Sequence, residues 1–104
     1  MSFRRYEIIL PTRYNDDALV EPEKFLLIAE EIVAQFGAVT MHPEPLRGTW
    51  VSEGSRYEDE NVKLVVDVED TGENAAFFIR QKQILKKRFR QLDIWIVSYE
   101  IRLT

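Results

Sequence analysis

The order of hydrophobic and polar positions predicts six secondary-structure elements. Residues 4–10 (RRYEIIL) alternate as a strand does, with Tyr6, Ile8 and Leu10 on one face. A helix is expected after Pro22, which suits a first helical position, and Gly37 is the expected left-handed stop. Its apolar side chains recur with helical spacing: Phe25, Ile28, Ala29, Ile32 and Phe36.

The middle of the chain predicts a long hairpin. Residues 38–52 are extended but contain Pro43 and Pro45, so they form an edge strand or one broken by a bulge. Gly54 supplies the turn, and residues 57–70 form a long strand whose core alternation starts only at Val62. The extended residues before Val62 are therefore expected to project beyond the helices.

A second helix is predicted from about residue 73 to residue 91, and a last strand over residues 93–103. Asp70 or Thr71 is the expected N-cap, and Asp70 with Glu73 matches a capping box. The apolar stripe of this helix comprises Ala75, Phe78, Leu85, Phe89 and Leu92. The last strand is rich in β-branched and aromatic residues. If its core face carries Trp95, Val97, Tyr99, Ile101 and Leu103, then Ile94 and Ile96 lie on the opposite face of the sheet.

The resulting β-α-β-β-α-β order predicts a single α+β domain over residues 1–104 with a ferredoxin-like fold. Four antiparallel strands would carry both helices on one face. The expected core is Tyr6, Ile8, Leu10, Phe25, Ile28, Ile32, Val62, Leu64, Val66, Phe78, Leu85 and Phe89. The opposite, open face mixes Ile9 and Val65 with charged residues, and faces of that kind commonly pack on another subunit.

Composition narrows the possible functions. The 104 residues carry a formal charge of −4 and no cysteine, which excludes disulfides, thiolate ligands and a cysteine nucleophile and fits a cytoplasmic location. No segment has the ~20 apolar residues of a membrane span, so no membrane association is expected. The acidic balance also makes nucleic acid an unlikely partner, although Arg80, Lys87 and Arg90 on the second helix offer a weaker alternative mode of binding.

No motif for catalysis, a metal or a cofactor is recognised. His42 is the sole histidine and lacks the spacing of a zinc motif, and neither a phosphate loop nor a nucleophile elbow occurs. We therefore expect no catalytic residue, no metal site and no cofactor, and lean away from an enzyme. The alternative is a small cofactor-free oligomeric enzyme whose pocket lies between sheet and helices.

The residues with most potential for binding lie on the loop after the first strand and on the hairpin. Arg13, Tyr14, His42, Trp50 and Tyr57 are the candidate ligand-binding residues. Trp50 and Tyr57 flank the Gly54 turn as possible cross-strand neighbours, and with Ile9 and Val65 they are the candidate interface residues. The favoured function is a non-enzymatic homo-oligomeric interaction or ligand-sensing module, most simply a dimer, with an unknown small ligand.

Two resemblances support this interpretation at the level of fold. The GTW segment at Gly48 and the acidic strand after it resemble small bacterial ferredoxin-like proteins. The long hairpin and the start YEIILP are similar to PII and CutA-like trimers, whose loops lie at subunit boundaries; the glycine-rich nucleotide segments of PII are absent. The chain also has the size of CRISPR-associated nucleases of this fold, but Leu10 and Pro11 stand where those carry an aspartate.

Overall fold

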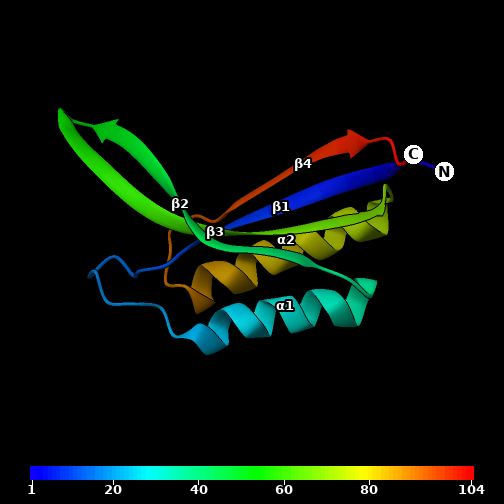
Figure 1. The fold of residues 1–104 in the computed structure, drawn as a ribbon, viewed down its shortest axis with the longest axis horizontal. Coiled ribbons are helices and arrows are strands. Elements are labelled where there is room, and N and C mark those ends of the chain that lie inside the picture. Colours follow the sequence, from blue (N-terminus) through cyan, green and yellow to red (C-terminus); the bar gives the residue numbers. More distant parts are fainter.

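The computed structural model describes the backbone of residues 1–104 and every side chain except those of residues 43–45. The elements are β1 (Phe3–Pro11), α1 (Pro22–Phe36), β2 (Thr40–Ser52), β3 (Ser55–Glu69), α2 (Gly72–Arg88) and β4 (Trp95–Ile101). An antiparallel sheet of order β2-β3-β1-β4 carries both helices on one face, as Figure 1 shows.

The α+β architecture with two helices and an antiparallel sheet is as predicted. The expected layout of four strands is not exact, because strand-like pairing also occurs outside them. An isolated bridge joins Arg13 to Leu19 in the loop after β1, outside the named strands. The bridge closes the loop on itself, and the backbone N–H of Thr12, which donates to the carbonyl of Glu60, ties the loop to the end of the sheet. This attachment holds the loop beside the base of the hairpin.

The β2–β3 hairpin projects beyond both helices (Figure 1). Its strands pair from Leu46 and Asn61 out to Ser52 and Ser55, and the turn residues Glu53 and Gly54 have φ values of 51° and 80°. Positive φ at both central residues is the arrangement that matches the twist of a two-residue hairpin. β2 is an edge strand whose register shifts between His42 and Leu46, as its two prolines predicted.

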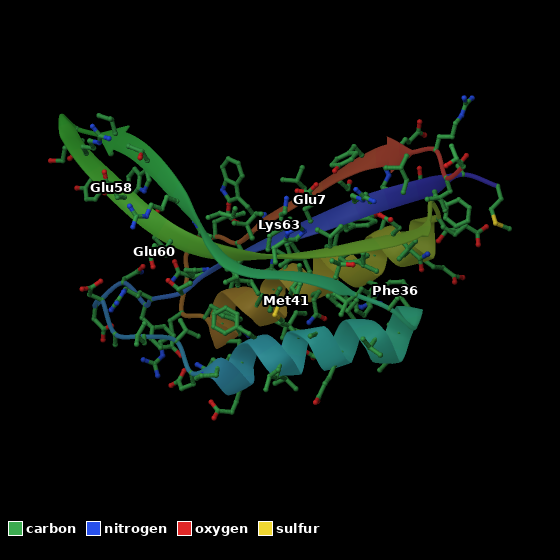
Figure 2. All side chains as sticks on the ribbon, viewed as in Figure 1. Glu7, Phe36, Met41, Glu58, Glu60 and Lys63 are labelled. Atoms are coloured by element: carbon green, nitrogen blue, oxygen red, sulfur yellow. The ribbon has the colours of Figure 1, made fainter. Side chains whose placement is uncertain are left out.

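The core lies between the sheet and the helices. Figure 2 shows Phe36 and Met41 there, and Glu7 on the other side of the sheet. Of the expected core residues, all are buried except Phe25, which is partly buried and packs edge-on against Phe89. Five further residues are buried that are not among the expected core residues: Tyr14, Val20, Val68, Ile94 and the polar Gln81.

The predicted orientation of β4 was wrong. Ile94 is 2% exposed and Ile96 packs on the core, whereas Trp95, Val97 and Tyr99 are 68%, 42% and 42% exposed. The register explains the inversion. Ile96 lies opposite the buried Ile8, and directly opposed residues of an antiparallel pair share a face.

The second helix begins at one of its two predicted N-caps but ends earlier than predicted. Thr71 is the N-cap, and its side chain accepts from the backbone N–H of Asn74. The capping box is not what closes this end, because Asp70 accepts a hydrogen bond from Arg4. At the other end α2 stops at Arg88, so Leu92 lies outside the helix and is 92% exposed.

Candidate functional site

The open sheet face is built from alternate residues of β1, β3 and β4. Ile9 and Val65 lie on it as predicted, partly buried by their neighbours. Since β4 presents Trp95 and Val97 outward, these two side chains join them. The face therefore carries Trp95 and Val97 in place of the predicted Ile94 and Ile96, and neither helix of the chain covers it (Figure 1).

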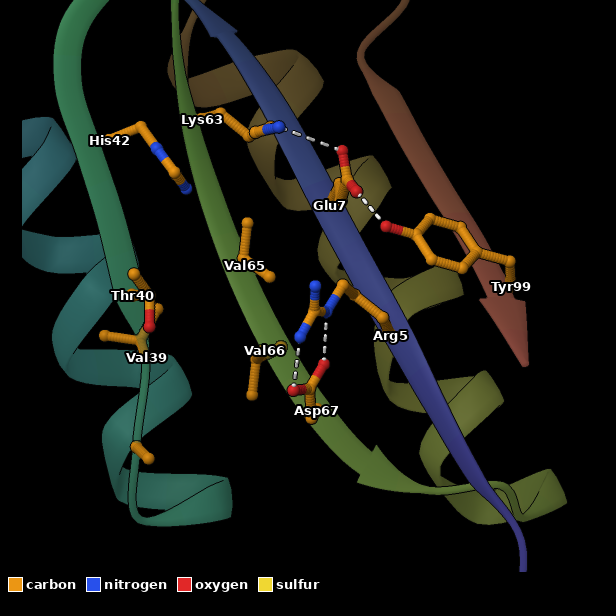
Figure 3. Close-up of a pocket in the computed structure, with 11 residues that line it drawn as sticks. Arg5, Glu7, Val39, Thr40, His42, Lys63, Val65, Val66, Asp67 and Tyr99 are labelled. Carbon is orange, nitrogen blue, oxygen red and sulfur yellow. Dashed lines mark hydrogen bonds and ion pairs between the residues drawn. The ribbon is translucent and has the colours of Figure 1, made fainter. Parts of the chain in front are cut away.

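Polar side chains on the same face are organised as two ion-paired groups (Figure 3). Arg5 donates two hydrogen bonds to Asp67, at 2.7 and 2.9 Å. Glu7 accepts a hydrogen bond from the Tyr99 hydroxyl and lies 3.3 Å from the Lys63 ammonium. Three strands thus contribute to one network across the sheet.

Hydrogen bonds and ion pairs in this network shift the pKa values of its members. The hydrogen bond from Tyr99, with help from Lys63, holds the pKa of Glu7 below its usual range, and the same bond raises the pKa of Tyr99. The hydrogen bond from Arg5 lowers the pKa of Asp67. Both carboxylates are therefore held in the charged form at neutral pH.

His42 lies at the border of this face, on β2. It lines a hollow of about 470 Å³ together with Thr40, Lys63 and the two ion-paired groups. The hollow is separate from the one that holds the other candidate ligand-binding residues. His42 therefore does not join Arg13, Tyr14, Trp50 and Tyr57 in one site.

Those four residues line a larger groove, of about 1250 Å³, at the base of the hairpin. β1 ends at Pro11, opposite Asn61, so the part of β3 nearer the turn has β2 on one side only. The groove lies along this free edge, between the hairpin, the loop after β1 and residues 91–95. Neither α1 nor α2 lines it, so the groove is not the predicted pocket between sheet and helices.

The aromatic pair on the hairpin is geometrically defined. The rings of Trp50 and Tyr57 stack with centroids 4.3 Å apart and an interplanar angle of 17°. The indole Nε1 of Trp50 donates to Asp59 Oδ2 at 2.7 Å, which fixes the orientation of the ring. Both aromatic side chains are nearly half exposed, although they cover each other.

Tyr14 is a buried member of the groove lining, as is Ile94. Its hydroxyl donates to Glu21 and accepts from Lys24, and its ring lies beneath the Arg90 guanidinium at 4.6 Å. The hydrogen bond from Tyr14 lowers the pKa of Glu21. Lys24 also donates to the carbonyl of Arg88 at 2.8 Å, so this cluster joins the loop, the start of α1 and the end of α2.

Part of the positive charge of α2 is paired with carboxylates of the same chain. Arg88 Nη2 donates to Glu31 at 3.2 Å, and Lys82 lies 3.0 Å from Asp93. Arg90 follows the end of the helix with φ of 54° and stacks on Tyr14, so Arg80, Lys87 and Arg90 do not form one helical face.

Within the part of the chain that the structure describes, no group of three or more His, Asp or Glu side chains is arranged to hold a metal ion. In the same described part, no helix is long and apolar enough to cross a membrane. The carboxylates of the groove are thus not gathered into a metal centre.

Comparison with known proteins places the fold. No protein-family model and no curated protein sequence matches the chain. Among solved structures, it is similar to CutA1 of Thermus thermophilus, a divalent cation tolerance protein. The TM-score is 0.67 at 20% identity, over 98% of this chain and 86% of that one.

Two further solved structures share the architecture. A phage SAM lyase in complex with S-methyl-5′-thioadenosine gives a TM-score of 0.65 at 13% identity, covering 98% of this chain and 90% of that one. The GlnK–ATP complex of Bacillus subtilis gives 0.57 at 18% identity, covering 96% and 82%. The predicted fold-level resemblance to CutA and PII-like proteins is confirmed. Identities this low establish the fold alone.

Proposed function

We propose that the protein is a homo-oligomeric module that binds a small ligand at a subunit boundary. The observation that carries this proposal is the uncovered apolar strip on the open sheet face, formed by Ile9, Val65, Trp95 and Val97. Exposed apolar side chains gathered on one face are typical of protein interfaces. Polar side chains lie among them here, since the strand register places Glu7 between Val65 and Val97. These polar groups are already paired with one another and so cost less to cover.

The projecting hairpin extends the same surface. Trp50 and Tyr57 are large aromatic side chains on an arm that its own helices do not cover, and such residues dominate interface energetics. One sheet face plus the hairpin is large enough for a standard interface, with about 800 Å² buried per partner.

The arrangement of subunits follows from which surfaces meet. Two open faces that pack on each other about a two-fold axis make a dimer, the simplest closed oligomer. A hairpin that packs on a different surface of its neighbour makes a heterologous contact, which gives a ring when the rotation from one subunit to the next closes. The CutA-like resemblance implies three subunits in such a ring, and we retain the dimer as the simpler starting hypothesis.

Ligand binding is supported by the groove beside the hairpin and by the comparisons. The groove joins residues from the loop, the hairpin and the start of β4, which a neighbouring subunit would enclose further. Two proteins of this fold are described with adenosine-containing ligands, the phage lyase and GlnK. An enzymatic role and a cytoplasmic location remain predictions from the sequence.

Sedimentation velocity near 10 µM at moderate salt tests self-association. We expect a species heavier than the 12.3 kDa monomer, and its mass distinguishes two subunits from three. A single monomeric species would refute the oligomer. A thermal-shift screen of metabolites, including ATP and S-methyl-5′-thioadenosine, tests ligand binding, since a ligand that binds only the folded state raises Tm.

A further inference from the structure

The groove at the base of the hairpin combines aromatic surface with negative charge. Trp50, Tyr57 and Trp95 all line it and are 47%, 44% and 68% exposed. These are large apolar rings left in contact with water. Its volume of about 1250 Å³ is sufficient for a small organic molecule.

The charges that line the groove are unequal. Five carboxylates face two guanidinium groups, those of Arg13 and Arg47. The carboxylates belong to Asp17, Glu58, Asp59, Glu60 and Asp93. Some of this charge is neutralised by neighbours: Asp17 lies 3.9 Å from Arg13, Glu58 lies 3.5 Å from Arg56, and Asp93 is paired with Lys82.

Asp59 and Glu60 supply the remaining negative charge along the free edge of β3. Asp59 accepts from the Trp50 indole, so its carboxylate is held next to the stacked aromatic pair. The Glu60 carboxylate has no ion pair among the side chains that the structure describes. Figure 2 shows Glu60 at the base of the hairpin, near the loop after β1.

We propose that this groove binds an organic cation, an amine or quaternary ammonium group carried on an apolar body. The cationic group would lie beside Asp59, which shares a face of β3 with Tyr57, while Glu60 on the opposite face of the strand adds negative potential. The apolar body would lie against Trp95 and the outer side of the stacked Trp50–Tyr57 pair. Cations are attracted both to carboxylates and to the faces of aromatic rings, of which Trp is the best. The inference names the ligand class of the proposed binding module and therefore rests on that function.

The chain contains its own reporter, because both of its tryptophans line the groove. Titration of the full-length protein with phenethylammonium, followed by tryptophan fluorescence, measures occupancy directly. Phenethyl alcohol and 3-phenylpropionate are the matched neutral and anionic probes. We expect saturable binding of phenethylammonium at least tenfold tighter than that of the alcohol, weakening as salt rises, and no saturable binding of the anion.

Two variants locate the cation. Asp59→Asn keeps an oxygen that can accept from Trp50 but removes the charge, and should weaken phenethylammonium at least fivefold with little effect on the alcohol. Glu69→Gln is the matched control, since Glu69 is an exposed acid of the same strand outside the groove. It should leave all three affinities unchanged.

Three outcomes would overturn the inference. Equal or tighter binding of the anion would assign the groove to Arg13 and Arg47. An unchanged affinity in Asp59→Asn would place the cation elsewhere. No saturable response in a protein shown to be oligomeric would mean that a neighbouring subunit fills the groove. In each case the oligomer mass and the metabolite screen still decide the proposed function independently.

Discussion

Trp50 and Tyr57 stack across the β2–β3 hairpin, with ring centroids 4.3 Å apart, on an arm that projects beyond both helices. The pair stabilises the arm locally, as aromatic pairs contribute about 0.5–1.5 kcal/mol beyond the area they bury. Because both rings are nearly half exposed, they also leave surface for contact with another subunit.

Replacement of both rings by alanine should weaken self-association more than it weakens the fold. The core lies under the other end of the sheet, so the helices and the remaining strands keep their packing. Sedimentation velocity across a concentration series measures the shift toward monomer, and circular dichroism checks the fold. An oligomer of unchanged strength would remove Trp50 and Tyr57 from the interface.

Val97→Lys should disrupt the oligomer through the open face. Val97 is 42% exposed and belongs to the apolar strip, so a lysine there would place a charge in the buried part of the interface. Val33→Lys is the matched control, since Val33 is 44% exposed but lies on α1, on the other side of the molecule. If both variants sediment like the parent protein, the open face is not the interface.

Leu85→Ala should lower the free energy of unfolding by about 2–5 kcal/mol, because Leu85 is fully buried and its truncation leaves a cavity. Leu26→Ala should cost no more than about 0.5 kcal/mol, since Leu26 is 58% exposed. Urea denaturation at one fixed protein concentration measures both. Equal stability of the two variants would contradict the core assignment.

Glu7→Gln should reduce stability at neutral pH and lose this effect in acid. The pKa of Glu7 is lower in the folded protein than its ordinary value near 4.5, so ionised Glu7 stabilises the fold above that pH. The contribution disappears as the pH falls through the folded-state pKa. Urea midpoints between pH 7 and pH 3 should therefore converge for the parent and Glu7→Gln proteins. A gap that stays constant with pH would show that Glu7 acts only through packing, and Glu30→Gln is the surface control.

Tyr14→Phe should destabilise the loop after β1 and release Glu21. The change removes a buried hydroxyl that serves Glu21 and Lys24, at an expected cost of about 1–3 kcal/mol. The pKa of Glu21 should then rise toward its ordinary value, which NMR titration of its side-chain carbon can follow. Tyr57→Phe is the control on an exposed tyrosine, and an unmoved Glu21 pKa would contradict the role of Tyr14.

Local patterns predicted the elements well wherever one face alternates clearly. Ile8 and Leu64 belong to strands whose buried and exposed positions alternate, and Gly37 ends its helix with φ of 83° as predicted. The phase of β4 could not be predicted this way, because Ile94, Trp95, Ile96 and Val97 are all apolar and either phase yields an apolar face.

The candidate site was predicted in part. Arg13, Tyr14, Trp50 and Tyr57 line one groove, but His42 lies in another hollow, and Trp95 was assigned to the wrong face. Trp95 is exposed because it pairs with Ile9 of the neighbouring strand β1, and these two residues are 86 positions apart in the sequence. Sequence spacing carries no information about such a register.

The sequence by itself determined the order of elements, the long hairpin and its turn, because these follow from short-range periodicity and from the backbone preferences of proline and glycine. Tertiary structure alone decided which face of β4 is buried, how Tyr14 joins the loop to both helices, and where the groove lies. Those features depend on strand register and on side chains brought together from distant segments, where the cost of burying a residue is set by its neighbours in space.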